Sequence, residues 1–181
     1  MKIKSLRDLY IHELKDLYSA ETQITKALPK MAKAASNEEL AEGFRTHLEE
    51  TKGQIERLKQ ILEELGETTR GEKCAGMEGL LEEGAKMMEE DLPEELLDAA
   101  LIGAAQKVEH YEISGYGTVR TFAELLGEDD AAELLQLTLD EESATDEKLT
   151  QLAENIVNPE AEDADEDEEE EAPKSKAGKK K

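Results

Sequence analysis

Apolar residues recur at every third or fourth position along four long stretches of the chain, which is the spacing of one face of an α-helix. In the first stretch, residues 5–35, this face is apolar or aromatic at every position but one. It reads Tyr10, Leu14, Leu17, Glu21, Ile24, Leu28, Met31 and Ala35. The same spacing continues over residues 36–66, 93–127 and 130–158. The pattern therefore predicts an all-α protein built on four long helices.

The boundaries of these stretches carry residues that commonly start or stop helices. Residues 36–39, Ser-Asn-Glu-Glu, have the form of a capping box, and Pro93 suits the first turn of the third helix. Gly66 and Gly127 stand where the second and third helices should end. Very little chain separates the first helix from the second, or the third from the fourth. Each pair must therefore form an antiparallel hairpin.

Residues 67–92 connect the two hairpins and are long enough to run the length of a bundle. They begin with the polar segment ETTRGEK and continue as MEGLLEEGAKMMEE, whose spacing predicts a short amphipathic helix. A long crossover between two helical hairpins is typical of ferritin-like folds. We therefore predict that residues 1–158 form a ferritin-like four-helix bundle, with a short extra helix in the crossover.

Residues 159–181 have a different composition and read PEAEDADEDEEEEAPKSKAGKKK. Such a segment offers no sizeable apolar side chain to bury, so we expect a disordered acidic tail with a basic end. It accounts for −5 of the formal net charge of −24, so the helical part is itself strongly acidic.

Composition and charge exclude several classes of protein. Aromatic residues make up 3% of the chain and Trp is absent, which disfavours a β-sandwich or barrel. A net charge of −24 disfavours binding to nucleic acid. We expect no membrane span and no signal peptide, because the chain has no long apolar run. Its one cysteine, Cys74, cannot form an internal disulfide, which fits the reducing cytoplasm.

Polar residues interrupt the apolar face of every long helix near its middle. Glu21 stands on the first face, and Glu142 on the fourth has Asp146 beside it. The second face carries His47, Thr51 and Gln54, with Glu50 alongside, and the third carries Glu109 and Glu112. Because these residues lie at similar separations from the turns of their hairpins, they should share one layer at mid-bundle. The pattern predicts that the acids point inward.

Carboxylates buried in an apolar layer are costly unless they are paired or bound to metal, and the lysines fall on outward positions. The sequence therefore predicts a centre of two divalent metal ions. Because the donors are mostly oxygens, iron or manganese is favoured. The candidate ligands are Glu21, His47, Glu50, Glu109, Glu112, Glu142 and Asp146.

Alternatives stay open for individual residues. The acids could be surface residues of a Glu-rich chain, and His47 could instead support Glu50 or be a core imidazole. Di-metal bundles commonly carry Glu-x-x-His, but Glu50 and Glu142 are followed three residues later by Gly53 and Thr145. Tyr18 and Tyr116 each stand one turn from a candidate ligand. Their hydroxyls could bind those carboxylates, trap radicals, or merely be satisfied within the core.

Several segments resemble the YciF-type family of ferritin-like bacterial stress proteins. They are YIHELKDLYSAETQ, HLEETKGQIERL, KCAGMEGLLEE, DAALIGAAQKVEHYEISGYGT and EESATDEKLTQLA, in that order between residues 4 and 158. The resemblance implies a four-helix ferritin-like fold, a homodimer and a di-iron or di-manganese site, without implying a settled reaction. By analogy with rubrerythrin-like proteins, it assigns Glu109 and Glu112 to the glutamate pair of the third helix.

Two functional hypotheses follow. The first is a di-metal carboxylate protein of the stress response that oxidises Fe(II) or reduces a peroxide. The alternative is a non-catalytic, dimeric helical bundle that acts through metal or partner binding.

Overall fold

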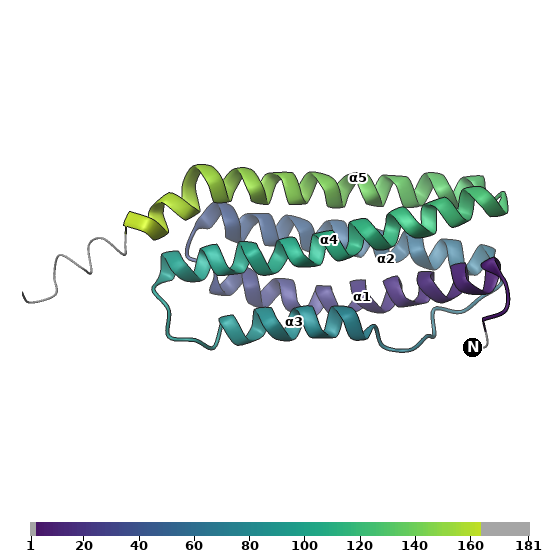
Figure 1. Cartoon of the computed structure of the whole chain (residues 1–181), viewed down its shortest axis with the longest axis horizontal. Helices are drawn as coiled ribbons and strands as arrows, with labels where there is room; N and C mark the ends of the chain where they lie inside the picture. The colour runs from purple at the N-terminus through teal and green to yellow at the C-terminus, as the bar shows by residue number, and fades with distance from the viewer. Residues whose placement is uncertain (1–2, 164–181) are drawn as a thin grey trace, which may run out of the picture.

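Five helices make up the structure, a computed structural model that describes residues 3–163. In chain order they are α1 (Leu6–Ala34), α2 (Glu38–Glu64), α3 (Ala75–Met87), α4 (Glu94–Leu126) and α5 (Asp129–Leu152), which continues into the π-helical turn η1 (Ala153–Val157). The described residues contain no strand. Figure 1 shows the four long helices side by side and the short α3 along their outside. The predicted all-α, ferritin-like bundle is confirmed.

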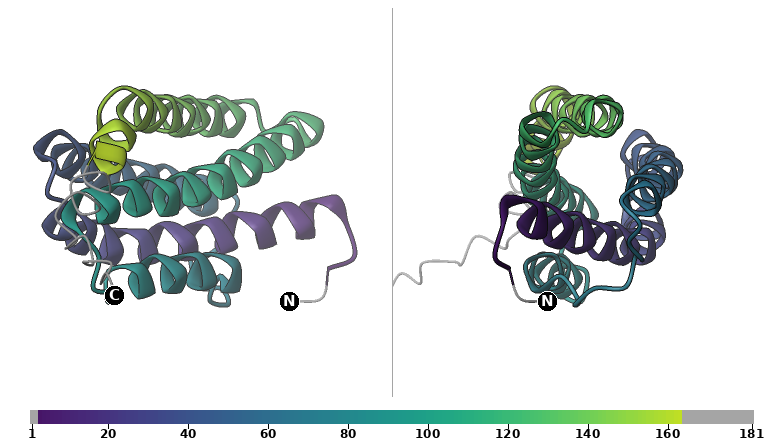
Figure 2. Two further views of the ribbon diagram at one scale, coloured as in Figure 1. Left: turned by 60° about the vertical axis from the view of Figure 1, so that its left-hand side comes forward. Right: turned by 90° about the vertical axis from the view of Figure 1, so that its right-hand side faces the viewer.

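The topology is that of two hairpins joined by a crossover. α1 packs against α2 and α4 against α5, and the two hairpins meet through contacts of α1 with α4 and of α2 with α5. α3 returns along the bundle and packs on α1 and α4 (Figure 2). Within residues 3–163, none of the helices has both the length and the apolar character needed to cross a lipid bilayer.

The turn between α1 and α2 is held by a side chain from α4. The N-cap of α2 is Asn37, whose side chain accepts hydrogen bonds from the backbone N–H groups of Glu39 and Leu40. Ser36 has a different role, because its backbone N–H and its hydroxyl both donate to the buried carboxylate of Asp98. Asp98 also accepts from the backbone N–H of Asn37, so it fixes this turn to the second hairpin.

The last helix is longer than its sequence pattern indicates. The pattern predicts that it fades near Asn158, whereas helical backbone continues through the π-helical turn to residue 163. Residues 164–181, which include most of the expected acidic tail, lie outside the described residues.

The apolar core consists of two clusters separated along the bundle. One contains Ile24, Leu28, Met31, Phe44 and Leu149 among others, and the second contains Tyr10, Leu14, Leu58, Ile61 and Val119 among others. Between them on the four long helices lie the buried polar residues Glu21, His47, Thr51, Gln54, Glu109, Glu112 and Glu142. The bundle thus holds a polar layer between two apolar cores, as the interrupted faces predict.

Candidate metal centre

A compact group of potential ligands lies in this layer. It consists of His47 on α2, Glu109 and Glu112 on α4, and Glu142 on α5. One ligand atom from each side chain lies within 4.8 Å of all the others. None of the four residues is more than 3% exposed. The apolar periodicity brings them together because each stands on the inward face of its helix.

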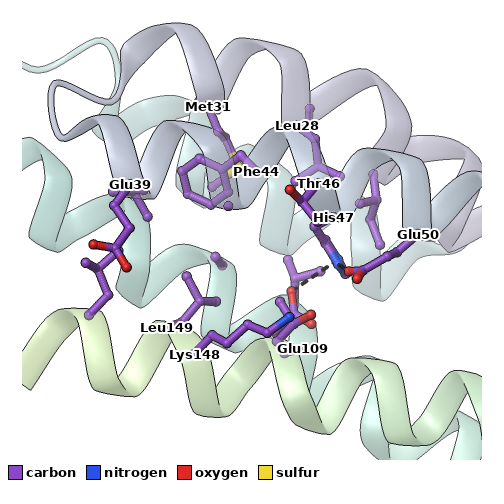
Figure 3. Close-up of a pocket in the computed structure, with 18 of the residues that line it drawn as sticks. Leu28, Met31, Glu39, Phe44, Thr46, His47, Glu50, Glu109, Lys148 and Leu149 are labelled. Carbon is purple, nitrogen blue, oxygen red and sulfur yellow. Dashed lines mark ion pairs between the residues drawn. The ribbon is translucent and has the colours of Figure 1, made fainter.

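His47 lies at the meeting point of three carboxylates without being tightly bonded to any of them. Its Nε2 is 3.4 Å from Oε1 of Glu109 and 3.9 Å from Oε2 of Glu142. Its Nδ1 is 3.5 Å from Oε2 of Glu50, which is partly exposed at the edge of the group (Figure 3). These separations exceed the usual N–H···O distance, and neither ring nitrogen has a hydrogen-bond partner among the described residues.

Unpartnered oxygens are concentrated in the same place. Both carboxylate oxygens of Glu112 and one oxygen each of Glu21, Glu109 and Glu142 are buried without a hydrogen-bond partner in the described part of the chain. Buried polar atoms are rarely left in this state, because losing water without a replacement partner costs free energy. A cation among these oxygens would remove that cost, so the donor set fits a bound metal.

The electrostatics agree with this interpretation. Burial, together with repulsion from Glu142, raises the pKa of Glu21 and of Glu109 well above the ordinary value. Burial, followed by repulsion from Glu21, does the same to the pKa of Glu112. The pKa of Glu142 is also raised by burial, although His47 opposes the shift. Without a metal, these carboxyl groups are driven toward their protonated forms.

Glu21 extends the group toward α1. It is fully buried, and its Oε1 accepts a hydrogen bond from the phenolic O–H of Tyr116. Tyr116 is therefore a hydrogen-bond partner of a candidate ligand, one of the roles its position suggested. Burial and the negative charge of Glu21 raise the pKa of Tyr116 well above its ordinary value, so the phenol stays protonated and can donate.

Glu50 differs from the other glutamates in its environment. Interaction with the His47 imidazole lowers its pKa, an effect that outweighs partial burial. It is therefore ionised at neutral pH and stands where solvent and the buried group meet. Within residues 3–163, the contact of Glu50 with the group is its ion pair with His47.

The structure does not bring Asp146 into the group. Its Oδ1 accepts from Nε2 of Gln106 at 3.2 Å, and its Oδ2 lies 3.3 Å from Nε2 of His110. His110 is largely exposed, so this carboxylate faces the outer side of the α4–α5 contact. We therefore leave Asp146 out of the centre proposed below.

A supporting chain of contacts behind Glu142 was not predicted. Nε2 of Gln54 donates to Oε1 of Glu142 and, at 3.1 Å, to Oε2 of Glu141. The guanidinium of Arg57 binds both oxygens of Glu141, at 2.7 and 2.6 Å. The sequence pattern could have indicated Gln54, because this residue stands on the inward face of α2. Glu141 and Arg57 gave no such signal, because both are partly exposed.

Two helical hairpins joined by a long crossover give this four-helix bundle a ferritin-like topology. The chain belongs to the DUF892 family, a domain of unknown function, whose sequence profile matches residues 5–162. It is 55% identical over 163 residues to the protein YciF of Escherichia coli strain K12, covering 90% of this chain and 98% of YciF. The predicted YciF-type relationship is thereby confirmed.

Solved structures also show the relationship to YciF. The crystal structure of the E. coli stress protein YciF superposes with a TM-score of 0.83, covering 86% of this chain and 99% of that one. YcfI from Rhodopseudomonas palustris, proposed to be a structural protein, is 46% identical, with a TM-score of 0.80 and coverages of 82% and 95%. A Xanthomonas campestris protein at 23% identity, with a TM-score of 0.69 and coverages of 89% and 99%, shares the fold.

Proposed function

We propose that the protein is a di-metal carboxylate protein of the bacterial stress response. The observation that supports this most strongly is the set of buried, unpartnered donor atoms on His47, Glu109, Glu112 and Glu142. Glu50 beside His47, and Glu21 beside Tyr116, extend the set at its two ends. Six side chains are more than one tetrahedral ion needs, and they suit two ions that share bridging carboxylates.

The donor chemistry supports iron or manganese. One imidazole and five carboxylates form a hard, oxygen-rich environment, which disfavours copper and zinc. The charge also fits, because two divalent cations would nearly neutralise the five carboxylates, and burial opposes the ionisation of the four other than Glu50. When bound, such a metal pair would supply electrons to an oxidant, so we propose that the protein oxidises Fe(II) or reduces a peroxide.

The surrounding side chains would prepare the centre for that chemistry. Tyr116 holds a proton at Oε1 of Glu21, and Gln54 fixes one oxygen of Glu142. The two apolar clusters flank the layer along the bundle. A carboxylate with an unpartnered oxygen could move between binding one metal ion and bridging two without first breaking a hydrogen bond.

A non-catalytic function is the second candidate. YcfI is proposed to be structural, and a dimeric bundle acting through metal or partner binding would use the same fold. The homodimer, the cytoplasmic location and the absence of nucleic-acid partners also stay predictions.

Metal analysis tests the proposal. Protein purified from its native host should contain about two iron or manganese ions per chain. Metal-free protein titrated anaerobically with Fe(II) and then given peroxide should develop the absorption of a bridged diferric centre. Glu109→Gln and Glu142→Gln should lose metal, whereas the exposed Glu49→Gln should not. Unchanged metal content in both centre variants would refute the site, and binding without oxidation would favour the non-catalytic function.

A further inference from the structure

A cavity of about 220 Å³ leads from the surface between α2 and α5 to the candidate metal centre. The exposed residues of its lining stand on these two helices and are Glu39, Gly43, Thr46 and Lys148. Its inner end is lined by His47 and Glu109, two candidate ligands that are no more than 3% exposed. The cavity is therefore a route from solvent to the proposed centre.

The walls of this route are apolar. They consist of buried side chains from the four long helices, among them Leu28, Met31, Phe44, Val108 and Leu149. Figure 3 shows His47 and Glu109 close together, with Phe44 and Met31 farther along the cavity. A molecule in this route gains free energy from each apolar group that it buries against the walls.

The charges in the lining disfavour an ionic substrate. Among the described residues, the lining contains the acids Glu39, Glu50 and Glu109 and one lysine, Lys148. An anion would face this excess of negative charge. The apolar walls would also remove water from an ion of either sign without supplying a partner. The substrate that fits the route is uncharged, with one apolar part and one polar part.

We propose that the cavity admits uncharged organic hydroperoxides, with the apolar substituent along the walls and the O–O group toward His47 and Glu109. This inference rests on the proposed function and names the class of peroxide. Hydrogen peroxide has two hydroxyl groups that apolar side chains cannot satisfy, so it gains nothing from these walls. A cavity of about 150 Å³ lined by similar side chains accommodates benzene, so this one has room for a substituent of about nine carbons.

The reaction is a two-electron reduction of the hydroperoxide. The substrate's O–O bond breaks on accepting two electrons from two Fe(II) ions of the proposed centre and two protons from water. The products are an alcohol, water and two Fe(III) ions. The alcohol keeps the apolar substituent and leaves by the same route.

Two tertiary hydroperoxides test the role of the substituent. Cumene hydroperoxide carries a phenyl group where tert-butyl hydroperoxide has a methyl group, and the O–O group is otherwise in the same environment. Full-length protein loaded anaerobically with Fe(II) should react at least about tenfold faster with cumene hydroperoxide, measured by stopped-flow absorption. Equal rate constants would overturn the proposal.

The products and a third oxidant separate this inference from the metal function. Cumene hydroperoxide should give 2-phenylpropan-2-ol, and acetophenone as the main product would overturn the two-electron step. If bound Fe(II) reacts with hydrogen peroxide at least as fast as with cumene hydroperoxide, the proposed function stands and the substrate class is overturned. If bound Fe(II) reacts with neither, the oxidative function and the substrate class both fail.

Binding to the metal-free protein gives a measurement that needs no reaction. Isothermal titration with 2-phenylpropan-2-ol and with 2-methylpropan-2-ol compares the two apolar substituents without an O–O bond. The phenyl compound should bind at least about tenfold more tightly. Absence of binding by 2-phenylpropan-2-ol would overturn the proposal.

Two glycines of α2 offer a matched pair of variants. Both are exposed, and a Cβ at either Gly43 or Gly53 would meet no atom within 4 Å. Of the two, Gly43 lines the cavity. Gly43→Leu should narrow the mouth and lower the affinity for 2-phenylpropan-2-ol at least tenfold, whereas Gly53→Leu should leave it unchanged. Wild-type affinity in folded Gly43→Leu, or the same loss in both variants, would overturn the proposed route.

Discussion

The phenolic O–H of Tyr116 on α4 donates a hydrogen bond to Oε1 of Glu21 on α1, within the buried polar layer. Both residues are fully buried, so this bond joins the two hairpins at a place that water does not reach. The second oxygen of Glu21 has no hydrogen-bond partner among residues 3–163. Tyr116 thus satisfies half of the carboxylate and leaves the remaining half available to a cation.

Removal of that donor should destabilise the bundle. Tyr116→Phe leaves Oε1 of Glu21 buried without a partner, and the loss of a hydrogen bond to a buried carboxylate costs about 2 kcal/mol. Urea unfolding of the metal-free protein measures the effect. Tyr18→Phe is the matched control, because no hydrogen bond of its hydroxyl occurs in the described residues. A similar loss in both variants would mean that Tyr116 contributes through packing alone.

The buried carboxyl groups should give the metal-free protein an unusual pH dependence. The pKa values of Glu21, Glu109 and Glu112 are raised in the folded state, so the folded protein binds more protons than the unfolded chain. Their contribution to stability is therefore complete below the ordinary pKa of 4.5 and is lost as pH rises through the raised values. We expect the free energy of unfolding to fall from about pH 5 upward.

Urea denaturation of chelator-treated protein at successive pH values measures this slope. Glu112→Gln should flatten it, since the variant has one fewer buried group to ionise, and the exposed Glu49→Gln should not. Iron or manganese should restore stability at neutral pH, because the bound cation stabilises the ionised forms. If the free energy of unfolding of the metal-free protein rises between pH 5 and 8, the raised pKa values of the buried glutamates are contradicted.

Helical periodicity was sufficient to predict the fold and most of the candidate centre. Glu21, Glu109, Glu112 and Glu142 occupy positions that an apolar face assigns to the interior, and all four are buried. Both hairpins followed from the short connections between helices. The contacts at the start of α2 were less predictable. The capping-box pattern begins at Ser36, whereas the N-cap residue is Asn37.

Contacts that depend on a neighbouring helix were not accessible from the sequence. Asp146 lies four residues after Glu142, but Gln106 and His110 of α4 hold its oxygens away from the group. The pairing of Arg57 with Glu141 likewise depends on how α2 and α5 are aligned. Periodicity gives the face on which a residue lies, and the partner across the interface decides where its side chain points.

Gln54 should control metal affinity although it supplies no ligand in the proposed centre. Its Nε2 holds Glu142, and Arg57 in turn fixes the Glu141 carboxylate that Gln54 also contacts. Gln54→Leu frees the Glu142 carboxylate and should weaken metal binding about 10- to 100-fold, as is usual for residues that orient ligands. Competition with a chelator measures this, with the exposed Gln60→Leu as control. Wild-type affinity in Gln54→Leu would exclude the positioning role.

Asp98 should contribute to stability without affecting the centre. Its carboxylate accepts hydrogen bonds from the backbone N–H groups of Ser36 and Asn37 and from the Ser36 hydroxyl. Asp98→Ala leaves these donors without that partner, and we expect a loss of about 3 kcal/mol in the free energy of unfolding. The exposed Asp140→Ala, which removes one contact with Gln136, should cost less than about 0.5 kcal/mol. Metal content should be unchanged in both, because Asp98 binds the turn at the end of the bundle. A large loss of metal in folded Asp98→Ala would show instead that the α1–α2 turn sets the positions of the ligands at mid-bundle.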